Sequence, residues 1–272
     1  MIRLLLPRPA GDLLRLVTQP DHAHLAGEAL SLFRLPELTG HPRREALLRA
    51  VRLHDNGWRE LDAAPPVDPA SGLPYGFIEL PSAHRLEAWE RGTARYAGSD
   101  PYAALLAVEH ALVLHADRRD REGWRELLPR LDERRAELLA TCGLGEGELA
   151  ADYRWLGLAD TLSLAACAGW SEPSERHGFT IAPAAPAPDP PALAARTPDS
   201  PAQDLTAHDL TAQDLTALAV QVRLAPFPLA GATTLAVPCR LLPARRYGGD
   251  ADLGAALAAA PWRSLAVRVA PG

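Results

Sequence analysis

The chain has 272 residues and is 47% hydrophobic, enough to form one large domain or two smaller ones around an extensive core. Its net charge of -6 argues against a surface that binds nucleic acid, and the lack of any run of about 18 apolar residues argues against a transmembrane helix. The apolar N-terminal stretch is too short for a signal sequence, and the 3 cysteines lack metal-site spacing, so we expect a cytoplasmic protein without disulfides.

The first part of the chain predicts a hairpin and then a run of helices. Short apolar segments at 2–6 and 13–17 flank a turn that contains Pro and Gly. Helical periodicity then extends to about residue 170, with Asp100 expected as an N-cap before Pro101. The predicted helices are 21–34, 42–56, 82–97, 101–117, 121–141 and 146–168.

The composition changes sharply after residue 180. Residues 182–216 are rich in Pro and Ala and contain a short repeat, so we predict a low-complexity linker. Strands at 218–225 and 234–242, a helix at 250–260 and a strand at 264–270 follow. We therefore predict a mainly α protein. Its helical domain at 1–181 begins with a short hairpin, and residues 217–272 form a small β-β-α-β extension packed on it.

Helical spacing selects particular histidines and carboxylates as inward-facing. His22 shares its face with core-like residues, whereas His24 lies on a polar face. His54 and Asp55 follow an apolar helix and precede Gly57, which suits a helix C-cap. We expect the end of that helix to let both side chains converge on one ion.

Two further residues lie in apolar helical surroundings. His110 is on the apolar stripe of its helix, so it is either a ligand or a buried neutral histidine. His115 is expected to face solvent. Asp160 occupies an apolar stretch, and a buried carboxylate needs either a cation or hydrogen-bond donors. A metal ion or an arginine would meet that need.

Residues near these positions are candidates for a substrate pocket. Trp58 and Tyr75 are expected in the pocket wall, and Arg59 is one of several arginines, with Arg52 and Arg85, that could neutralise a phosphate. His84 lies on a mixed face: it is either a surface residue or a further ligand.

The order of these residues resembles the metal-binding pattern of the HD-domain superfamily, which consists largely of metal-dependent phosphohydrolases. The resemblance implies an HD-domain-like helical bundle in which His22, His54, Asp55, His110 and Asp160 bind metal, with His110 and Asp55 as catalytic residues. If His84 also faced inward, the set would resemble that of dinuclear HD proteins, some of which are diiron oxygenases.

The local sequence around these residues also resembles that of one uncharacterised bacterial family, domain of unknown function 3891. The similarity covers nearly the whole chain apart from the linker, and no activity comes with it. It rests on Asp21-His22-Ala23, His54-Asp55 with Gly57-Trp58, Ala159-Asp160 with Leu162-Ser163, and Ala225-Pro226-Phe227.

The sequence leaves three functions open. The first is a hydrolase of a small phosphorylated or nucleotide-like substrate that uses one divalent metal (Zn, Mn, Mg or Fe). The second is an HD-type oxygenase with two irons, which needs both His84 and His110 as ligands. The third is a non-catalytic module with a structural metal or polar core. A small molecule is the expected partner, with neither nucleic acid nor membrane, and the oligomeric state stays open.

Overall fold

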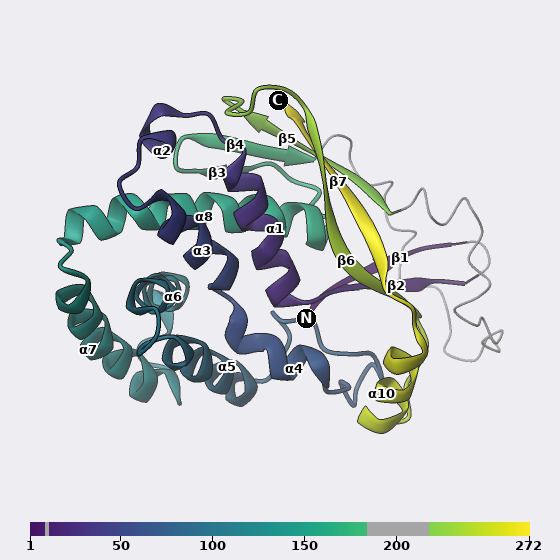
Figure 1. Ribbon diagram of the computed structural model, residues 1–272. Helices are drawn as coiled ribbons and strands as arrows, with labels where there is room; N and C mark the ends of the chain where they lie inside the picture. The colour runs from purple at the N-terminus through teal and green to yellow at the C-terminus, as the bar shows by residue number, and fades with distance from the viewer. Residues whose placement is uncertain (9–10, 184–217) are drawn as a thin grey trace.

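A curled sheet carries most of the helices on one side, and one C-terminal helix packs against the other face (Figure 1). The computed structural model describes residues 1–8, 11–183 and 218–272. Seven strands form the sheet in the order β1-β2-β6-β7-β5-β4-β3. The strands are β1 (Ile2–Leu6), β2 (Leu13–Val17), β3 (Ser174–Arg176), β4 (Phe179–Pro183), β5 (Ala219–Ala225), β6 (Thr233–Pro243) and β7 (Arg263–Pro271).

The helices lie close to the predicted ranges. Asp100 caps its helix as predicted, with its side chain accepting a hydrogen bond from the backbone N–H of Ala103. The α-helices are α1 (Gln19–Ser31), α2 (Pro36–Thr39), α3 (Arg44–Leu53), α4 (Arg59–Ala63), α5 (Ser82–Arg95), α6 (Pro101–Leu114), α7 (Trp124–Cys142), α8 (Glu146–Ala168) and α10 (Asp250–Ala259). Two short 3-10 helices are η1 (Asn56–Trp58) and η2 (Ala116–Arg118).

The predicted mainly α class is wrong, because the molecule has an α/β fold. The N-terminal hairpin is not an appendage: β2 pairs with β6, so the hairpin continues into the C-terminal strands. At the other edge β5 pairs with β4, a strand that the sequence patterns did not reveal. All neighbouring strands are antiparallel except β5 and β7, which run parallel. Strands predicted as two small pieces therefore unite into one large sheet.

Most of the predicted linker lies outside the described residues. Of the range 182–216, the structure describes Ala182 and Pro183, which end strand β4. The short repeat also lies outside. Among the residues that are described, no helix is long and apolar enough to cross a membrane.

Strand β2 is buried on both of its faces, and this anchors the helices that carry the site. Leu13 and Val17 join the main core, which includes residues of α1 and α8. Leu14 and Leu16 face a second cluster, which α10 covers with Leu253 and Leu257. Arg15 points toward α8, where its guanidinium donates to the backbone carbonyls of Ala166 and Cys167.

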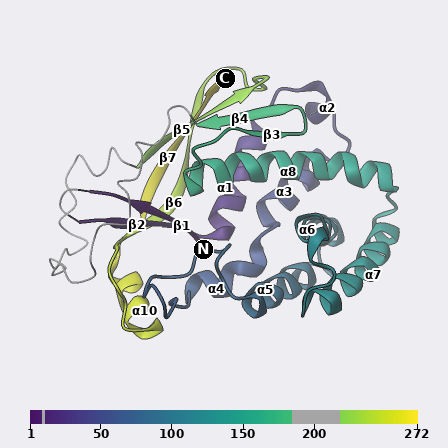
Figure 2. The ribbon, with the colours of Figure 1, turned by 180° about the vertical axis from the view of Figure 1, so that it is seen from behind.

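The helices form successive layers away from the sheet. Helices α1 and α8 contact both the sheet and each other, and α3 packs against α1. Helix α6 packs on α3 and α8, and α5 and α7 lie outside it. Figure 2 shows α8 between the strands β3 and β4 and the remaining helices. The helices α1, α3, α6 and α8 thus surround one central region.

Candidate metal centre

Four separate segments bring histidines and aspartates together at the centre of the helical layer. His22 comes from α1, His54 and Asp55 from the end of α3, His110 from α6, and Asp160 from α8. All are buried, with exposed fractions of 0% for His22, 1% for His54 and His110, 5% for Asp160 and 6% for Asp55. The structure thus brings together the residues for which we predicted metal binding.

The ligand-type atoms of these residues are close together. His22 Nε2 lies 3.0 Å from Asp55 Oδ2 and 3.6 Å from Asp160 Oδ1. His54 Nε2 lies 3.3 Å from Asp160 Oδ1 and 3.6 Å from Asp55 Oδ2. Two groups have ligand atoms within 4.8 Å of one another: His22, His54 and Asp160, and His54, Asp55 and His110.

Hydrogen bonds from outside the cluster orient the imidazoles. Ser163 donates its hydroxyl proton to the carbonyl of Asp160 at 3.0 Å, so it accepts from His22 Nδ1 at 2.7 Å. A backbone carbonyl can only accept, so His54 Nδ1 donates to Val51 O at 2.7 Å. In both rings the proton on Nδ1 turns Nε2 toward the carboxylates, as in metal-binding histidines.

His110 is held in a similar way by Tyr153, whose hydroxyl lies 3.2 Å from His110 Nδ1. The His110 ring centroid is 4.9 Å from that of His54 and 5.8 Å from that of Trp89. Burial lowers the pKa of His110 to about 4, which keeps the ring neutral. A neutral imidazole can bind a metal or accept a proton.

The electrostatics of the cluster favour a cation at its centre, and without a metal ion that cation is the His54 imidazolium. Burial alone would lower the pKa of His54, but Asp55 and Asp160 outweigh it and raise the pKa to about 9. Burial alone would raise the pKa of both carboxyls, yet the histidines hold the pKa of Asp55 and of Asp160 below the usual range. The carboxylates therefore stay charged.

Two atoms at the centre of the cluster that lack a hydrogen-bond partner also favour a cation there. His54 Nε2 and Asp55 Oδ1 are buried and have no hydrogen-bond partner. Imidazole nitrogens and carboxylate oxygens suit zinc, iron and manganese, so the residues present fit a divalent metal ion.

A pocket of about 190 Å³ opens onto this cluster. Asp55, His110 and Asp160 form part of its wall. Its remaining walls consist of Gln19, Trp58, Phe77, Ile78, Arg85, Trp89, Leu114, His115, Arg118 and Leu164. The cluster is therefore accessible to a small molecule.

Only part of the predicted pocket wall lies there. Trp58 lines the pocket, whereas Arg59 is exposed and lines a different hollow beside Asp62. Tyr75 packs against the main core, and His84 is half-buried at the start of α5; neither lines the pocket. His84 belongs to neither of the two groups whose ligand atoms lie within 4.8 Å of one another, the metal-type groups.

The prediction that His115 faces solvent is wrong. Its ring is 9% exposed, and its centroid lies 4.0 Å from the Trp124 ring and 5.5 Å from the Trp89 ring. Helix α6 ends at Leu114, so helical spacing does not apply to the next residue. The sequence analysis did not predict Ser163, Tyr153 or Trp89 as site residues. Ser163 and Tyr153 lie on α8, about one and two helical turns from the predicted ligand Asp160. No sequence pattern around Trp89 indicated that it lies at the site.

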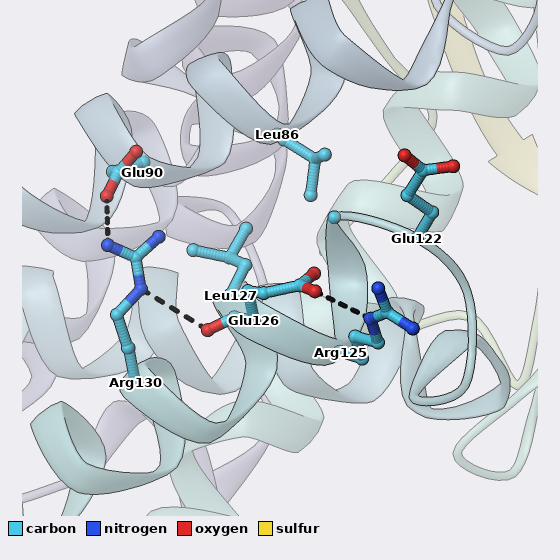
Figure 3. Close-up of a pocket in the computed structure, with 8 residues that line it drawn as sticks. Leu86, Glu90, Glu122, Arg125, Glu126, Leu127 and Arg130 are labelled. Atoms are coloured by element: carbon cyan, nitrogen blue, oxygen red, sulfur yellow. Dashed lines mark hydrogen bonds and ion pairs between the residues drawn. The ribbon is translucent and has the colours of Figure 1, made fainter.

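A larger pocket elsewhere has no comparable chemistry. Figure 3 shows this pocket of about 410 Å³ between α5 and the start of α7. Its charged side chains pair among themselves: Arg130 with Glu90 at 2.8 Å, and Arg125 with Glu126 at 2.6 Å. Size alone is therefore no guide to the site in this molecule.

Comparison with known proteins gives a family but no activity. Residues 5–244 match a family model described as protein of unknown function (DUF3891). No curated protein and no solved structure matches the chain.

Proposed function

The chain belongs to the DUF3891 family, to which no activity is assigned, and we propose from its site that it is a metal-dependent hydrolase of a small phosphorylated or nucleotide-like substrate. The observation that carries the proposal is the opening of a buried histidine and aspartate cluster onto a pocket. A purely structural ion would need no such opening, so the pocket favours catalysis over the non-catalytic alternative.

His22, His54, Asp55 and Asp160 would hold one divalent ion. When bound, the ion would supply Lewis acidity at a phosphoryl oxygen and lower the pKa of water. Ser163 and the carbonyl of Val51 fix the rings of His22 and His54, so these ligands are oriented before binding. Four ligands from two helices, α1 and α8, and from the end of α3 also tie the ion to the fold.

His110 and Asp55 are the proposed catalytic residues, because both lie at the cluster and line the pocket. His110 either completes the coordination of the ion or takes a proton from the attacking water. In the hydrolysis of a phosphomonoester, a bond forms between the water oxygen and phosphorus, and the ester P–O bond breaks. The proton lost by the water passes to the leaving oxygen, which gives an alcohol and inorganic phosphate.

The order of the ligands along the chain supports a relationship to HD-domain proteins as part of this proposal. A histidine on α1, a His-Asp pair after α3, a histidine on α6 and an aspartate on α8 reproduce that order on separate elements. The diiron alternative requires His84 as a ligand, and His84 lies outside both metal-type groups, so we favour the hydrolase.

Elemental analysis and a phosphatase assay test the proposal on the same samples. Purified wild-type protein should contain about one divalent metal per chain and hydrolyse p-nitrophenyl phosphate. The Asp55→Asn variant should lose both properties, while His24→Ala should keep them because His24 is exposed and outside the cluster. Wild-type protein that takes up no divalent metal, or an Asp55→Asn variant with unchanged metal content, would contradict the proposal.

A further inference from the structure

We propose that Arg85 and Arg118 form an anion-binding subsite in the pocket and select a compact phosphomonoester with a small apolar organic group. The inference depends on the proposed function for the reaction. Anion binding by the two arginines does not depend on the proposed function, because it can be measured without metal.

The charges of these two arginines are not neutralised by the protein. Within residues 1–8, 11–183 and 218–272, neither guanidinium forms an ion pair with a carboxylate. Arg85 donates to Ser82 Oγ at 3.3 Å, and the Arg118 guanidinium lies 5.4 Å from the centroid of the Trp124 ring. Five other arginines of this region do pair with acidic side chains: Arg91, Arg95, Arg119, Arg125 and Arg130.

The two positive charges also oppose each other. Burial lowers the pKa of Arg85, and the neighbouring Arg118 and Arg121 lower it further. In a chain of net charge -6, such a concentration of positive charge is not a general property of the surface. An anion between the guanidiniums would relieve the repulsion and accept their hydrogen bonds.

Several hydrogen-bond donors in the pocket wall have no partner. Arg85 Nε, Trp58 Nε1 and Trp89 Nε1 are buried donors without a partner, and both ring nitrogens of His115 also have none. Leaving a buried polar group unsatisfied costs about 1–3 kcal/mol, so these donors favour a ligand that accepts hydrogen bonds, such as an anion.

The donors lie close to the proposed metal-binding cluster. The Trp89 ring lies 5.8 Å from the His110 ring and 5.5 Å from the His115 ring. A phosphoryl group in the pocket could reach the arginines with some of its oxygens and the cluster with another. This placement would orient the phosphorus toward the proposed catalytic residues.

The size and the remaining wall of the pocket restrict the rest of the substrate. Phe77, Ile78, Leu114 and Leu164 supply an apolar lining. The volume of about 190 Å³ is near that of a cavity of about 150 Å³ that holds benzene, and below the roughly 300–1,000 Å³ typical of pockets for larger ligands. The pocket thus encloses a phosphoryl group with a compact apolar group, which favours a small phosphomonoester over a nucleotide.

Calorimetric titration of chelator-treated protein with inorganic phosphate tests the subsite without metal. Wild-type protein should bind about one phosphate per chain. Arg85→Gln and Arg118→Gln should each weaken binding about tenfold or more, as expected for the loss of a charge-assisted hydrogen bond. Arg125→Gln is the matched control, since it removes the same charge from a residue paired with Glu126. Thermal melts would verify that each variant is folded.

Two results would overturn the subsite. One is the absence of saturable phosphate binding in folded wild-type protein, and the other is equal weakening by Arg85→Gln and Arg125→Gln. Phenyl phosphate should compete with phosphate and bind more tightly, because the ring meets the apolar wall. Adenosine 5′-monophosphate binding tenfold tighter than phenyl phosphate would overturn the selection for a compact substrate.

The two proposals can fail separately. Arginine-dependent phosphate binding in a protein that takes up no metal would uphold the subsite and refute the hydrolase. Metal-dependent hydrolysis with phosphate affinity unchanged in Arg85→Gln and Arg118→Gln would uphold the hydrolase and refute the subsite.

Discussion

Ser163 orients the His22 ring, and its side chain also contacts the backbone of Asp160. Its hydroxyl proton is committed to the carbonyl of Asp160, so His22 Nδ1 donates to the Ser163 oxygen. The other ring nitrogen, Nε2, then faces Asp160 and is hydrogen-bonded to Asp55 Oδ2 at 3.0 Å. One hydroxyl on α8 thereby prepares a nitrogen on α1 to bind a cation.

We expect Ser163→Ala to lower the metal affinity by about 10–100-fold, the usual cost of losing a group that orients a metal-binding histidine. Competition with a chromogenic chelator would measure the affinity. Ser31→Ala is the matched control, because Ser31 is on α1 and donates only to the carbonyl of Glu28. Equal metal affinity in the two variants would show that Ser163 does not orient His22.

His115 should make the metal-free protein sensitive to acid. Burial first, and then Arg118 and Arg85, lower the pKa of His115 from 6.5 to about 3. Between these values the unfolded chain binds a proton that the folded protein does not, so stability falls as the pH falls below about 6.5. His115→Phe should reduce this slope by up to one proton, about 1.4 kcal/mol per pH unit.

Urea unfolding in the presence of chelator at pH 6.5, 5.5 and 4.5 would measure the effect. His24→Ala serves as the control, because that ring is exposed. A wild-type slope identical to that of His115→Phe would mean that His115 already titrates normally in the folded protein.

Helical periodicity predicted the buried residues where the helix was continuous around them. It separated His22 from His24 and predicted a buried position for Asp160, in the middle of α8. It was wrong for His115, which follows the last residue of its helix. Arg59 was chosen as an arginine that could neutralise a phosphate, Tyr75 as an aromatic residue for the pocket wall and His84 as a possible further ligand. The type of a residue does not determine which wall its side chain lines.

At the scale of elements, Gly57 allows η1 to contact α5. A Cβ atom at Gly57 would lie 2.2 Å from the carbonyl oxygen of Ala88 and 2.6 Å from Gly92 Cα. These are backbone atoms that cannot rotate away. The sequence suggested a C-cap role for this glycine, but close packing is the actual requirement, because Gly57 is not among the residues of positive φ.

We expect Gly57→Ala to destabilise the protein by about 1–3 kcal/mol through overpacking, and to weaken metal binding because Asp55 lies two residues before the glycine and Trp58 directly after it. Gly147→Ala, in α8, meets nothing within 4 Å and should stabilise by about 0.5–1 kcal/mol. Thermal denaturation of both variants would measure the difference. A neutral Gly57→Ala would show that η1 and α5 can separate at little cost.

The positions of most elements could be predicted from the sequence, but their pairing could not. Apolar alternation predicted β6 and β7 within a residue or two of their observed ends. Nothing local to β6 reveals that Leu242 lies opposite Leu14, because the two residues are far apart in the chain. Strands β3 and β4 are short and follow a long helix, so their alternation was too brief to recognise.

At the scale of the whole molecule, the C-terminal strands complete a sheet that the N-terminal part begins. Removal of residues 218–272 would leave β2 without β6 and β4 without β5. Buried residues such as Leu16 and Ile181 would then become exposed. We expect the fragment 1–183 to aggregate, because it would present unpaired strand edges and an uncovered core.

Size-exclusion chromatography and thermal melting of the 1–183 fragment would check this expectation. A substitution control is Trp262→Ala in the full chain, since Trp262 is 53% exposed and its loss leaves the sheet intact. A monomeric fragment with a cooperative melt would mean that the helical layer folds without the C-terminal strands.

The central position of β7 has a consequence for synthesis of the protein. This strand follows every other described element in the chain, yet it lies in the middle of the sheet, between β6 and β5. On the ribosome, the hairpin of β1 and β2 and the pair of β3 and β4 emerge long before the strand that joins them. The nascent chain therefore carries its helices, with the proposed metal ligands, beside unpaired strand edges until translation reaches residue 271. We expect chaperones to bind the chain during this period.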